Sequence, residues 1–275
     1  MAAFREQHLE QQHHQEWVEQ NMAKALLDHE IQLYCQPKYD IRTHQVIGAE
    51  SLARWISPEQ GFLGPGQFIP IFESNGFIMQ FDFYMLENTC LLQKRRLEQG
   101  KPIVPISVNM SRLQFSDPDY LAKIKDVADR YRLPQGAIEL EITETVLAGF
   151  NTQEQLKHYL SILDGLHALG FGLSMDDFGS GYSSLQMLAQ MPMDVIKIDR
   201  GLLLLAEKST KRHTILEAAI GLGQHLGIDV ICEGIETKEQ EELLLSLGCT
   251  EGQGFLFAKP MPGEDFERFL DEKLK

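Results

Sequence analysis

Short apolar runs alternate with longer stretches of helical periodicity along most of this chain. The runs are rich in β-branched and apolar residues, which is typical of buried strands. They are Ile31–Gln36, Val46–Arg54, Ile103–Asn109, Ile138–Glu141, Gly172–Asp176, Val195–Asp199, Val230–Glu233 and Gly254–Phe257. The helical stretches include Gln153–Leu169, Ser209–Leu226 and Lys238–Leu247, and a last helix is expected over Gly263–Leu274. Strands that alternate with helices predict an α/β fold with a largely parallel sheet.

This number of strands favours a closed barrel of the (β/α)8 type over an open sheet. The first two runs, however, are separated only by Pro37–Gln45. A parallel crossover needs a dozen or more residues, so these two strands should be antiparallel. We therefore predict a modified TIM (β/α)8 barrel with one antiparallel strand near the N-terminus.

Residues 1–30 differ from the rest of the chain. The stretch Gln7–Gln15 is polar and contains three histidines, and an apolar stripe at helical spacing begins only at Trp17. A histidine tract without accompanying carboxylate or cysteine spacing is weak evidence for a metal site. We expect residues 1–30 to form a helical connector from an upstream domain, and residues 31–275 to form the functional domain.

Composition limits the classes of function. The chain has 275 residues, 43% of them hydrophobic, and a formal net charge of −15, which disfavours binding to a nucleic acid polymer. The N-terminus is polar, without a visible signal peptide, and no apolar run approaches the ~20 residues of a membrane span. The four scattered cysteines are expected to be reduced thiols. We expect a cytoplasmic protein, or the cytoplasmic part of a larger one.

Two adjacent carboxylates, Asp176 and Asp177, end one predicted strand and are followed at once by glycines. Side chains alternate along a strand, so neighbouring aspartates point apart unless the backbone turns there. A turn would suit one carboxylate on each of two nearby cations, or one carboxylate bridging both. Asp and Gly are also ordinary turn residues, so this motif alone does not distinguish a metal site from a turn.

Polar side chains stand at or near the C-terminal end of every predicted strand. They are Gln36, Glu50, Asn109, Glu141, Asp176 with Asp177, Lys197, Glu233 and Gln253. In a barrel these ends form one mouth, where active sites are built from several strands. A simpler interpretation is that each residue marks the point where its strand meets solvent. That interpretation explains poorly why most of them are oxygen ligands, which hard divalent cations prefer.

A binuclear metal site can be assembled from these residues. Glu50, Asn109, Glu141 and Asp176 would form an oxygen cage for one divalent cation, and Asp177 would hold a second, with Asp176 bridging the two. Two metal ions about 4 Å apart stabilise displacement at phosphorus.

Lys197 lies inside an apolar strand, where a lysine is unfavourable unless it is paired. It would face the carboxylates and orient the attacking water. A structural ion pair with Asp199 or with a helix residue is the alternative. Glu233 follows the run Val230–Cys232. It would be a ligand of the second metal ion or the general base, and the sequence does not distinguish these two roles.

The segment Gly48–Trp55 resembles the signature of EAL domains, which are phosphodiesterases acting on cyclic di-GMP. The resemblance extends over residues 31–262, where further motifs follow in the family's order. They are Phe68–Glu73, Ser107–Ser111, Glu139–Glu144, Asp176–Leu185, Ile196–Asp199, Glu233–Thr237 and Gln253–Phe255. The three letters Glu-Xaa-Leu alone carry no weight, whereas this ordered set of motifs is specific.

The resemblance implies a modified TIM barrel that hydrolyses one phosphodiester bond of cyclic di-GMP and releases linear pGpG. It implies Mg²⁺ or Mn²⁺, with two ions in each active site. The implied metal ligands are Glu50, Asn109, Glu141, Asp176, Asp177 and Glu233. Lys197 and Glu233 match the pair that activates water, Glu50 is catalytic as a metal ligand, and Gln253 is a nearby polar support.

Other positions match contacts made outside the metal site. Arg54 matches a ligand of a substrate phosphate, and Gln36, Leu52, Asp82 and Gln253 match further substrate contacts. Asp82 is expected in a helix, where a solvated acid is the simpler interpretation.

Glu144 matches the residue that anchors the loop beginning with Asp-Asp-Phe-Gly. In this family the loop contributes to metal binding and to dimerisation. The resemblance therefore implies a homodimer formed through this loop region.

The chain departs from the family's usual pattern at two positions. Ser51 stands where Ala is commoner, and Ser180 stands where Thr is commoner. Serine is small, and at position 180 it keeps the hydroxyl, so we expect little effect on activity. Family members that only bind the ligand lack several metal ligands, whereas this chain keeps them all. We predict a competent enzyme, and the alternative is a non-catalytic cyclic di-GMP receptor domain.

Overall fold

A computed structural model of the chain describes residues 2–145, 152–179, 188–206 and 210–274. Its strands are β1 (Ile31–Asp40), β2 (Gln45–Ser57), β3 (Gly61–Leu63), β4 (Ile106–Asn109), β5 (Ile138–Thr143), β6 (Gly172–Phe178), β7 (Val195–Ile198), β8 (Asp229–Cys232), β9 (Glu251–Gly252) and β10 (Met261–Pro262). Its α-helices are α1 (Ala2–Leu27), α2 (Ile69–Asn75), α3 (Ile78–Glu98), α4 (Tyr120–Tyr131), α5 (Gln153–Ala168), α7 (Arg200–Ala206), α8 (Thr210–Leu226), α9 (Lys238–Ser246) and α10 (Gly263–Lys273). Short 3₁₀ helices are η1 (Pro65–Gln67) and η2 (Arg112–Ser116).

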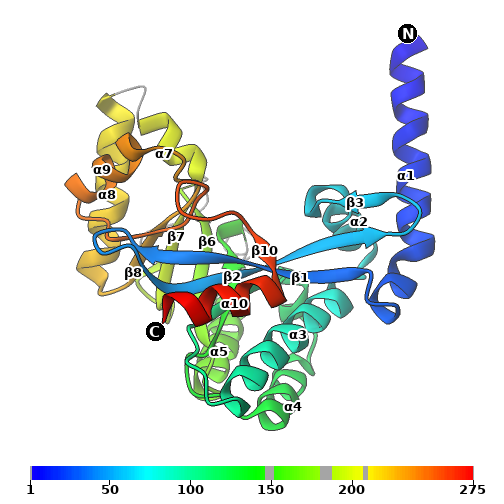
Figure 1. Ribbon diagram of the computed structural model, residues 1–275, viewed down its shortest axis with the longest axis horizontal. Helices are drawn as coiled ribbons and strands as arrows, with labels where there is room; N and C mark the ends of the chain where they lie inside the picture. The colour runs from blue at the N-terminus through cyan, green and yellow to red at the C-terminus, as the bar shows by residue number, and fades with distance from the viewer. Residues whose placement is uncertain (1, 146–151, 180–187, 207–209, 275) are drawn as a thin grey trace.

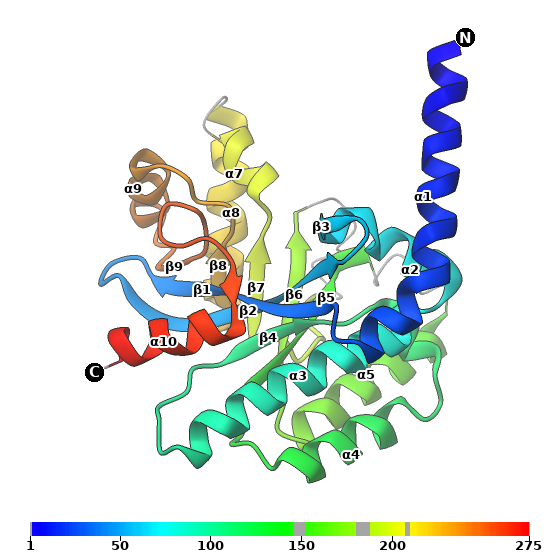
Figure 2. The ribbon, with the colours of Figure 1, turned by 45° about the vertical axis from the view of Figure 1, so that its right-hand side comes forward.

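The strands close into a barrel in the order β1, β2, β4, β5, β6, β7, β8, β9 and back to β1. Strands β2 and β4 to β9 are paired in parallel, whereas β1 is antiparallel to both of its barrel neighbours, β2 and β9. The predicted modified barrel with one antiparallel strand near the N-terminus is therefore confirmed. Helices α3, α4 and α5 gather on one side of the strands, and α7, α8 and α9 gather on the other (Figure 1, Figure 2).

The prediction of a strand over Gly254–Phe257 is wrong. The strand in this part of the chain is β9, and residues 254–257 form a turn in which Phe257 N donates to Gly254 O at 3.1 Å. The predicted strand over Ile103–Asn109 is also too long, because β4 begins only at Ile106. Pro105 precedes it and has no N–H group to donate to a neighbouring strand.

The C-terminal half of α1 packs against the barrel, while its N-terminal half projects away from the rest of the molecule (Figure 2). Val18 is fully buried, and the rings of Trp17 and Trp55 have their centres 5.0 Å apart. Trp17 Nε1 also donates to Glu59 Oε2 at 3.0 Å. The segment expected to be helical is thus a helix that is attached to β2, and its role as a connector stays a prediction.

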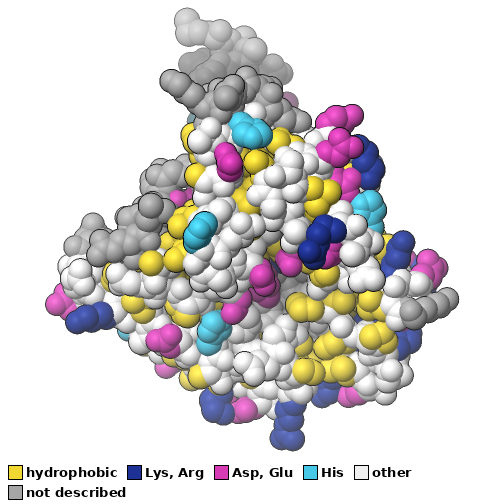
Figure 3. Space-filling model, turned by 90° about the vertical axis from the view of Figure 1, so that its left-hand side faces the viewer, with side chains coloured by type: hydrophobic (Ala, Val, Ile, Leu, Met, Phe, Trp, Pro, Cys, Tyr) yellow, Lys and Arg dark blue, Asp and Glu magenta, His cyan; other side chains and the backbone are white. Residues whose placement is uncertain are grey.

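The surface and the cysteines add little chemistry of their own. None of the helices in the described ranges is both long and apolar enough to cross a membrane. Figure 3 shows the face nearest α8 and α9. Among its coloured, described side chains, basic and acidic groups are mixed, and they form no continuous basic surface. Cys35, Cys90, Cys232 and Cys249 all lie in described segments, where each is buried and free.

Candidate active site

The ammonium group of Lys197 stands among four carboxylates at the mouth of the barrel. Its Nζ lies 2.6 Å from Glu233 Oε1, 2.8 Å from Glu141 Oε2, 3.4 Å from Asp176 Oδ1 and 3.6 Å from Glu50 Oε2. These carboxylates belong to β5, β6 and β2 and to the residue that follows β8. The structure therefore brings together side chains that are far apart in the sequence and were predicted at the strand ends.

The alternative partner of Lys197, Asp199, is engaged elsewhere. Asp199 Oδ1 accepts a hydrogen bond from Gly201 N at 2.7 Å, at the start of α7. The lysine of β7 thus faces the carboxylate cluster.

Glu141 is the most deeply buried of these carboxylates and contacts a second lysine. Its Oε1 accepts from Lys38 Nζ at 3.2 Å, while its Oε2 accepts from Lys197 Nζ at 2.8 Å. Burial alone would raise the pKa of Glu141, but Lys197 and Lys38 hold this pKa at about 2. Glu141 is therefore ionised at neutral pH.

The remaining carboxylates are less well compensated. Burial raises the pKa of Glu50 and of Asp176, and it raises the pKa of Glu233 to about 8, although Lys197 opposes the shift in each case. Burial would lower the pKa of Lys197, but the surrounding carboxylates, led by Glu141, raise it well above its ordinary value. Glu50, Asp176 and Glu233 therefore hold their protons more tightly than exposed carboxylates do.

Amide side chains support Glu50 on both of its oxygens. Asn109 Nδ2 donates to Glu50 Oε1 at 3.3 Å, and Gln253 Nε2 donates to Glu50 Oε2 at 2.8 Å. Gln253 Nε2 also donates to Gln36 Oε1 at 3.0 Å. These bonds connect β1, β2, β4 and the residue after β9, and they orient Glu50 within the mouth.

The backbone turns at the Asp176–Asp177 pair. Asp177 has a φ of 57°, in the left-handed region that few residues other than glycine adopt. The pairing of β6 with β7 also shifts its register between Met175 and Phe178, which is typical of a β-bulge. Both aspartates consequently line the same cavity, so adjacent carboxylates do serve one site.

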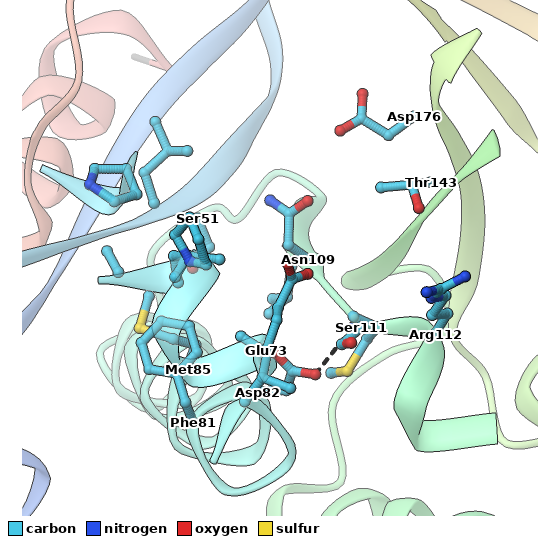
Figure 4. Close-up of a pocket in the computed structure, with 18 of the residues that line it drawn as sticks. Ser51, Glu73, Phe81, Asp82, Met85, Asn109, Ser111, Arg112, Thr143 and Asp176 are labelled. Carbon is cyan, nitrogen blue, oxygen red and sulfur yellow. Dashed lines mark hydrogen bonds between the residues drawn. The ribbon is translucent and has the colours of Figure 1, made fainter. Parts of the chain in front are cut away.

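A cavity of about 790 Å³ adjoins the carboxylates. Helix α3 contributes Phe81, Asp82 and Met85 to its wall, and Asn109 and Asp176 face it from β4 and β6 (Figure 4). The wall thus combines apolar side chains with the carboxyl of Asp82 on the side of α3, and it presents oxygen ligands on the side of β4 and β6.

A second, smaller cavity of about 140 Å³ is lined by Glu50 and Leu52 from the middle of β2. Gln36, Glu233 and Gln253 line it, and Leu52 lines both cavities. Arg54 is not among the described residues that line either one. Its guanidinium instead lies over the ring of Tyr34, at 5.6 Å from the ring centre.

Asp82 is buried, so the simpler interpretation of it as a solvated acid is wrong. Its Oδ2 accepts hydrogen bonds from Ser111 N and from Gln114 Nε2, each at 2.9 Å (Figure 4). Burial raises the pKa of Asp82 to about 7, although both hydrogen bonds oppose this shift. The carboxyl group therefore lies in the wall of the larger cavity and not on the outer surface.

Glu144 contacts the backbone directly after the Asp-Asp pair. Its Oε2 accepts a hydrogen bond from Gly179 N at 3.0 Å, and Gly179 has a φ of 97°. The loop that it is predicted to anchor, including Ser180, continues outside the described residues.

The donor set at the mouth fits a divalent cation, although no such cation is part of the structure. Among the described residues, no group of three or more His, Cys, Asp and Glu side chains is gathered closely enough to hold a metal ion, and the carboxylates surround Lys197 instead. Carboxylate and amide oxygens are nevertheless the ligands that Mg²⁺ and Mn²⁺ prefer. The crowding of four carboxylates around one ammonium group also suits a divalent cation, which would favour their ionised forms.

Sequence reasoning missed several residues at the site. Arg112 and Thr143 line the larger cavity (Figure 4), and Lys38 pairs with Glu141 below the mouth. Lys38 lies in the apolar strand β1, just as Lys197 lies in an apolar run. The same argument, that a buried lysine needs an acidic partner, would have predicted its pairing.

Comparison with known proteins agrees with this geometry. The family model of the EAL domain matches residues 19–260. The chain is 36% identical over 244 residues to the bifunctional diguanylate cyclase/cyclic di-GMP phosphodiesterase MucR of Pseudomonas aeruginosa, a match that covers 89% of this chain and 35% of that protein. It is 34% identical over 247 residues to the cyclic di-GMP phosphodiesterase RocR of the same species, which covers 90% of this chain and 61% of RocR. The chain thus spans only part of the length of these relatives.

Solved structures show the same fold. The chain superimposes with a TM-score of 0.83 on a structure described as "PaMucR Phosphodiesterase, c-di-GMP complex", at 35% identity, covering 91% of this chain and 99% of that one. The TM-score is 0.81 for the EAL enzyme Bd1971 in its cAMP-bound form, at 30% identity, covering 93% of this chain and 70% of that one. Since the family model and these relatives cover most of the sequence, the chain belongs to the EAL domain family.

Proposed function

We propose that this chain is a phosphodiesterase that hydrolyses cyclic di-GMP to linear pGpG and so lowers the level of this second messenger in bacterial signalling. The observation that carries the proposal is the cluster of Glu50, Glu141, Asp176 and Glu233 around Lys197, at the mouth of a barrel and beside a large cavity. Such a cluster suits the displacement of a phosphate ester by water.

The two cavities support a substrate with two lobes. They share Leu52, and carboxylates of the cluster line both, with Asp176 in the wall of the larger and Glu50 and Glu233 in the wall of the smaller. A cyclic dinucleotide has a nucleoside at each end and phosphates between them. In this arrangement each nucleoside occupies one cavity, with Asp82 in the wall of the larger and Gln36 and Gln253 in the wall of the smaller. Arg54 serves a substrate phosphate by turning from Tyr34 toward the cluster.

The proposed cofactors are Mg²⁺ or Mn²⁺, with two ions in each site. Glu50, Asn109, Glu141, Asp176, Asp177 and Glu233 are the residues that would hold them. Bound there, the ions supply Lewis acidity to the phosphodiester and neutralise the carboxylates.

The chain's own residues then handle water and protons. Lys197 donates to the attacking water and fixes its position, and Glu233 accepts the proton that the water loses as its oxygen attacks phosphorus. The bond between phosphorus and the 3′ oxygen breaks, the leaving oxygen gains a proton, and one molecule of water has been added to give pGpG.

The relatives support this assignment. A solved chain that this sequence covers to 99% is described as a phosphodiesterase in complex with c-di-GMP. RocR and PdeR, the latter from Escherichia coli, are both named cyclic di-GMP phosphodiesterases, and PdeR is 33% identical over 259 residues.

The product assay tests the proposal. Purified protein is incubated with cyclic di-GMP and either Mg²⁺ or Mn²⁺, and pGpG is measured by chromatography. We expect pGpG in a 1:1 ratio to the substrate consumed. Binding of cyclic di-GMP without product in either metal would instead support the non-catalytic receptor.

We further propose that the protein acts in the cytoplasm as a homodimer formed through the Asp-Asp-Phe-Gly loop region, and that residues 1–30 connect the EAL domain to an upstream domain. The contact of Glu144 with Gly179 supports a fixed start for this loop. Light scattering measures the dimer directly, and the substitution Glu144→Gln should weaken it. A monomer at all accessible concentrations would contradict the proposal.

A further inference from the structure

Lys38 crosses the interior of the barrel beneath the proposed metal site. It is buried on β1, and its Nζ lies 3.0 Å from Glu139 Oε1 and 3.2 Å from Glu141 Oε1. Both glutamates are on β5, which is separated from β1 in the ring by β2 and β4. The lysine therefore does not pair with a neighbouring strand but joins opposite parts of the barrel wall.

The sequence leaves room for this crossing. Lys38 is paired in register with Gly48 on β2, two residues before Glu50. A Cβ at position 48 would lie 3.1 Å from Pro105 O and 3.6 Å from Lys38 Cδ. The 3.6 Å separation is ordinary van der Waals contact, so the stem of the lysine passes alongside position 48, whereas the tight approach there is that of Pro105 O.

The crossing determines how Glu141 presents its carboxylate. Oε1 is taken by Lys38 on the inner side, and Oε2 faces Lys197 and the mouth. A carboxylate with one oxygen held by a fixed donor cannot rotate freely, so only the other oxygen is offered to a ligand at the mouth. Groups that orient a metal ligand from behind in this way affect metal affinity strongly.

We propose that Lys38 is a positioning residue, which holds Glu141 so that its Oε2 is directed to the divalent cation. This inference rests on the proposed function, because it takes Glu141 to be a metal ligand. The competing explanation is that Lys38 only balances the charge of Glu139, whose side chain is 12% exposed at the inner end of β5.

Charge-matched variants separate these explanations. Lys38→Met/Glu139→Gln removes one positive and one negative charge, so the net charge of the interior is unchanged. Glu141, however, loses the ammonium group that donates to its Oε1. Glu139→Gln alone removes the other partner and leaves the Lys38–Glu141 contact. Mn²⁺ affinity is measured by calorimetry on the full chain without cyclic di-GMP, and folding is checked by thermal unfolding.

We expect Glu139→Gln to keep the wild-type affinity for Mn²⁺ and the folded double variant to bind Mn²⁺ about 10–100-fold more weakly. If the double variant binds as tightly as Glu139→Gln, the positioning role is overturned and Lys38 serves only to balance charge. Should the double variant not fold, Lys38→Met/Glu139→Met replaces the pair with apolar side chains, which buried pairs often tolerate, and is assessed by the same comparison. Failure of the wild-type chain itself to bind Mn²⁺ would contradict the metal site of the proposed function, and this inference with it.

Discussion

The Nζ of Lys197 lies 2.6 Å from Oε1 of Glu233, yet this oxygen has no hydrogen-bond partner among the described residues. The contact is thus an attraction between charges without the alignment of a hydrogen bond. At this distance the ammonium group of Lys197 attracts the carboxylate strongly, so Glu233 is held beside the lysine that is proposed to position the attacking water.

Glu233→Gln should lower kcat about 10²–10⁴-fold, because an amide of the same shape cannot accept the proton of the attacking water. Single-turnover formation of pGpG measures this effect. Glu239→Gln, at an exposed position on the neighbouring helix α9, is the matched control and should keep wild-type activity. Unchanged turnover in Glu233→Gln would remove this residue from the proton transfer.

Glu50→Gln should abolish turnover, with a loss of at least about 100-fold, because it removes a charged metal ligand at the centre of the amide network. The variant keeps one oxygen to accept from Asn109 or Gln253, so the fold should persist. Steady-state assays in saturating Mn²⁺ provide the measurement. Full activity would refute the assignment of Glu50 as a metal ligand.

Chelation with EDTA should stop the reaction, and added Mg²⁺ or Mn²⁺ should restore it. Because the proposed site exists only in the folded state, Mn²⁺ should also stabilise that state, by about 2.7 kcal/mol at a hundred times its Kd. Thermal unfolding with and without Mn²⁺ measures this gain. The same titration with Glu50→Gln should show a smaller gain, and equal gains in both proteins would place the cation elsewhere.

Asp82→Asn should change how stability depends on pH. Because the pKa of Asp82 is raised to about 7, the folded state binds more protons than the unfolded state between about pH 4 and pH 7. Stability due to this group therefore falls as pH rises through that range and stays lower above it. Asparagine resembles the protonated carboxyl and should make the protein more stable than wild type at pH 8 but not at pH 4.5.

Urea unfolding at the two pH values provides the test for Asp82. The exposed Asp126 on α4 is the matched control, since Asp126→Asn should leave the wild-type profile. A stability difference between Asp82→Asn and wild type that is the same at both pH values would contradict the prediction.

Gly254→Ala should destabilise the fold by about 1–3 kcal/mol, the usual cost of overpacking. A Cβ at this position would lie 2.1 Å from Ile235 O and 2.3 Å from Ile235 N, which are backbone atoms that cannot move aside alone. Gly221, inside α8, has no atom within 4 Å of its added Cβ. Gly221→Ala should therefore stabilise by about 0.5–1 kcal/mol. Denaturant unfolding of both variants checks the opposite signs.

Much of the architecture could be predicted because local rules determine it. The short link between the first two strands required them to be antiparallel, and the polar residue at each strand end marked the mouth. The strand predicted over Gly254–Phe257 was wrong because a turn can also be apolar when it packs against a neighbouring segment, here at Ile235. Nothing in the local pattern distinguishes the two cases.

The side-chain partners were harder to predict than the strands. The contact of Lys38 with Glu141 depends on which strands lie opposite each other in the closed ring. The local sequence pattern does not indicate which strands these are. The burial of Asp82 likewise depends on Ser111 and Gln114, which come from a different segment. Pairings of this kind follow from closure of the barrel.

The closing strand β9 is only two residues long, and it joins β8 to β1. Every proposed metal ligand, from Glu50 to Glu233, precedes it in the chain. During synthesis on the ribosome, all of these acidic groups have therefore been made before the ring of strands can close. Until Glu251 and Gly252 emerge, the ring of strands stays open, so the assembled mouth depends on a segment that is translated after all of its proposed ligands.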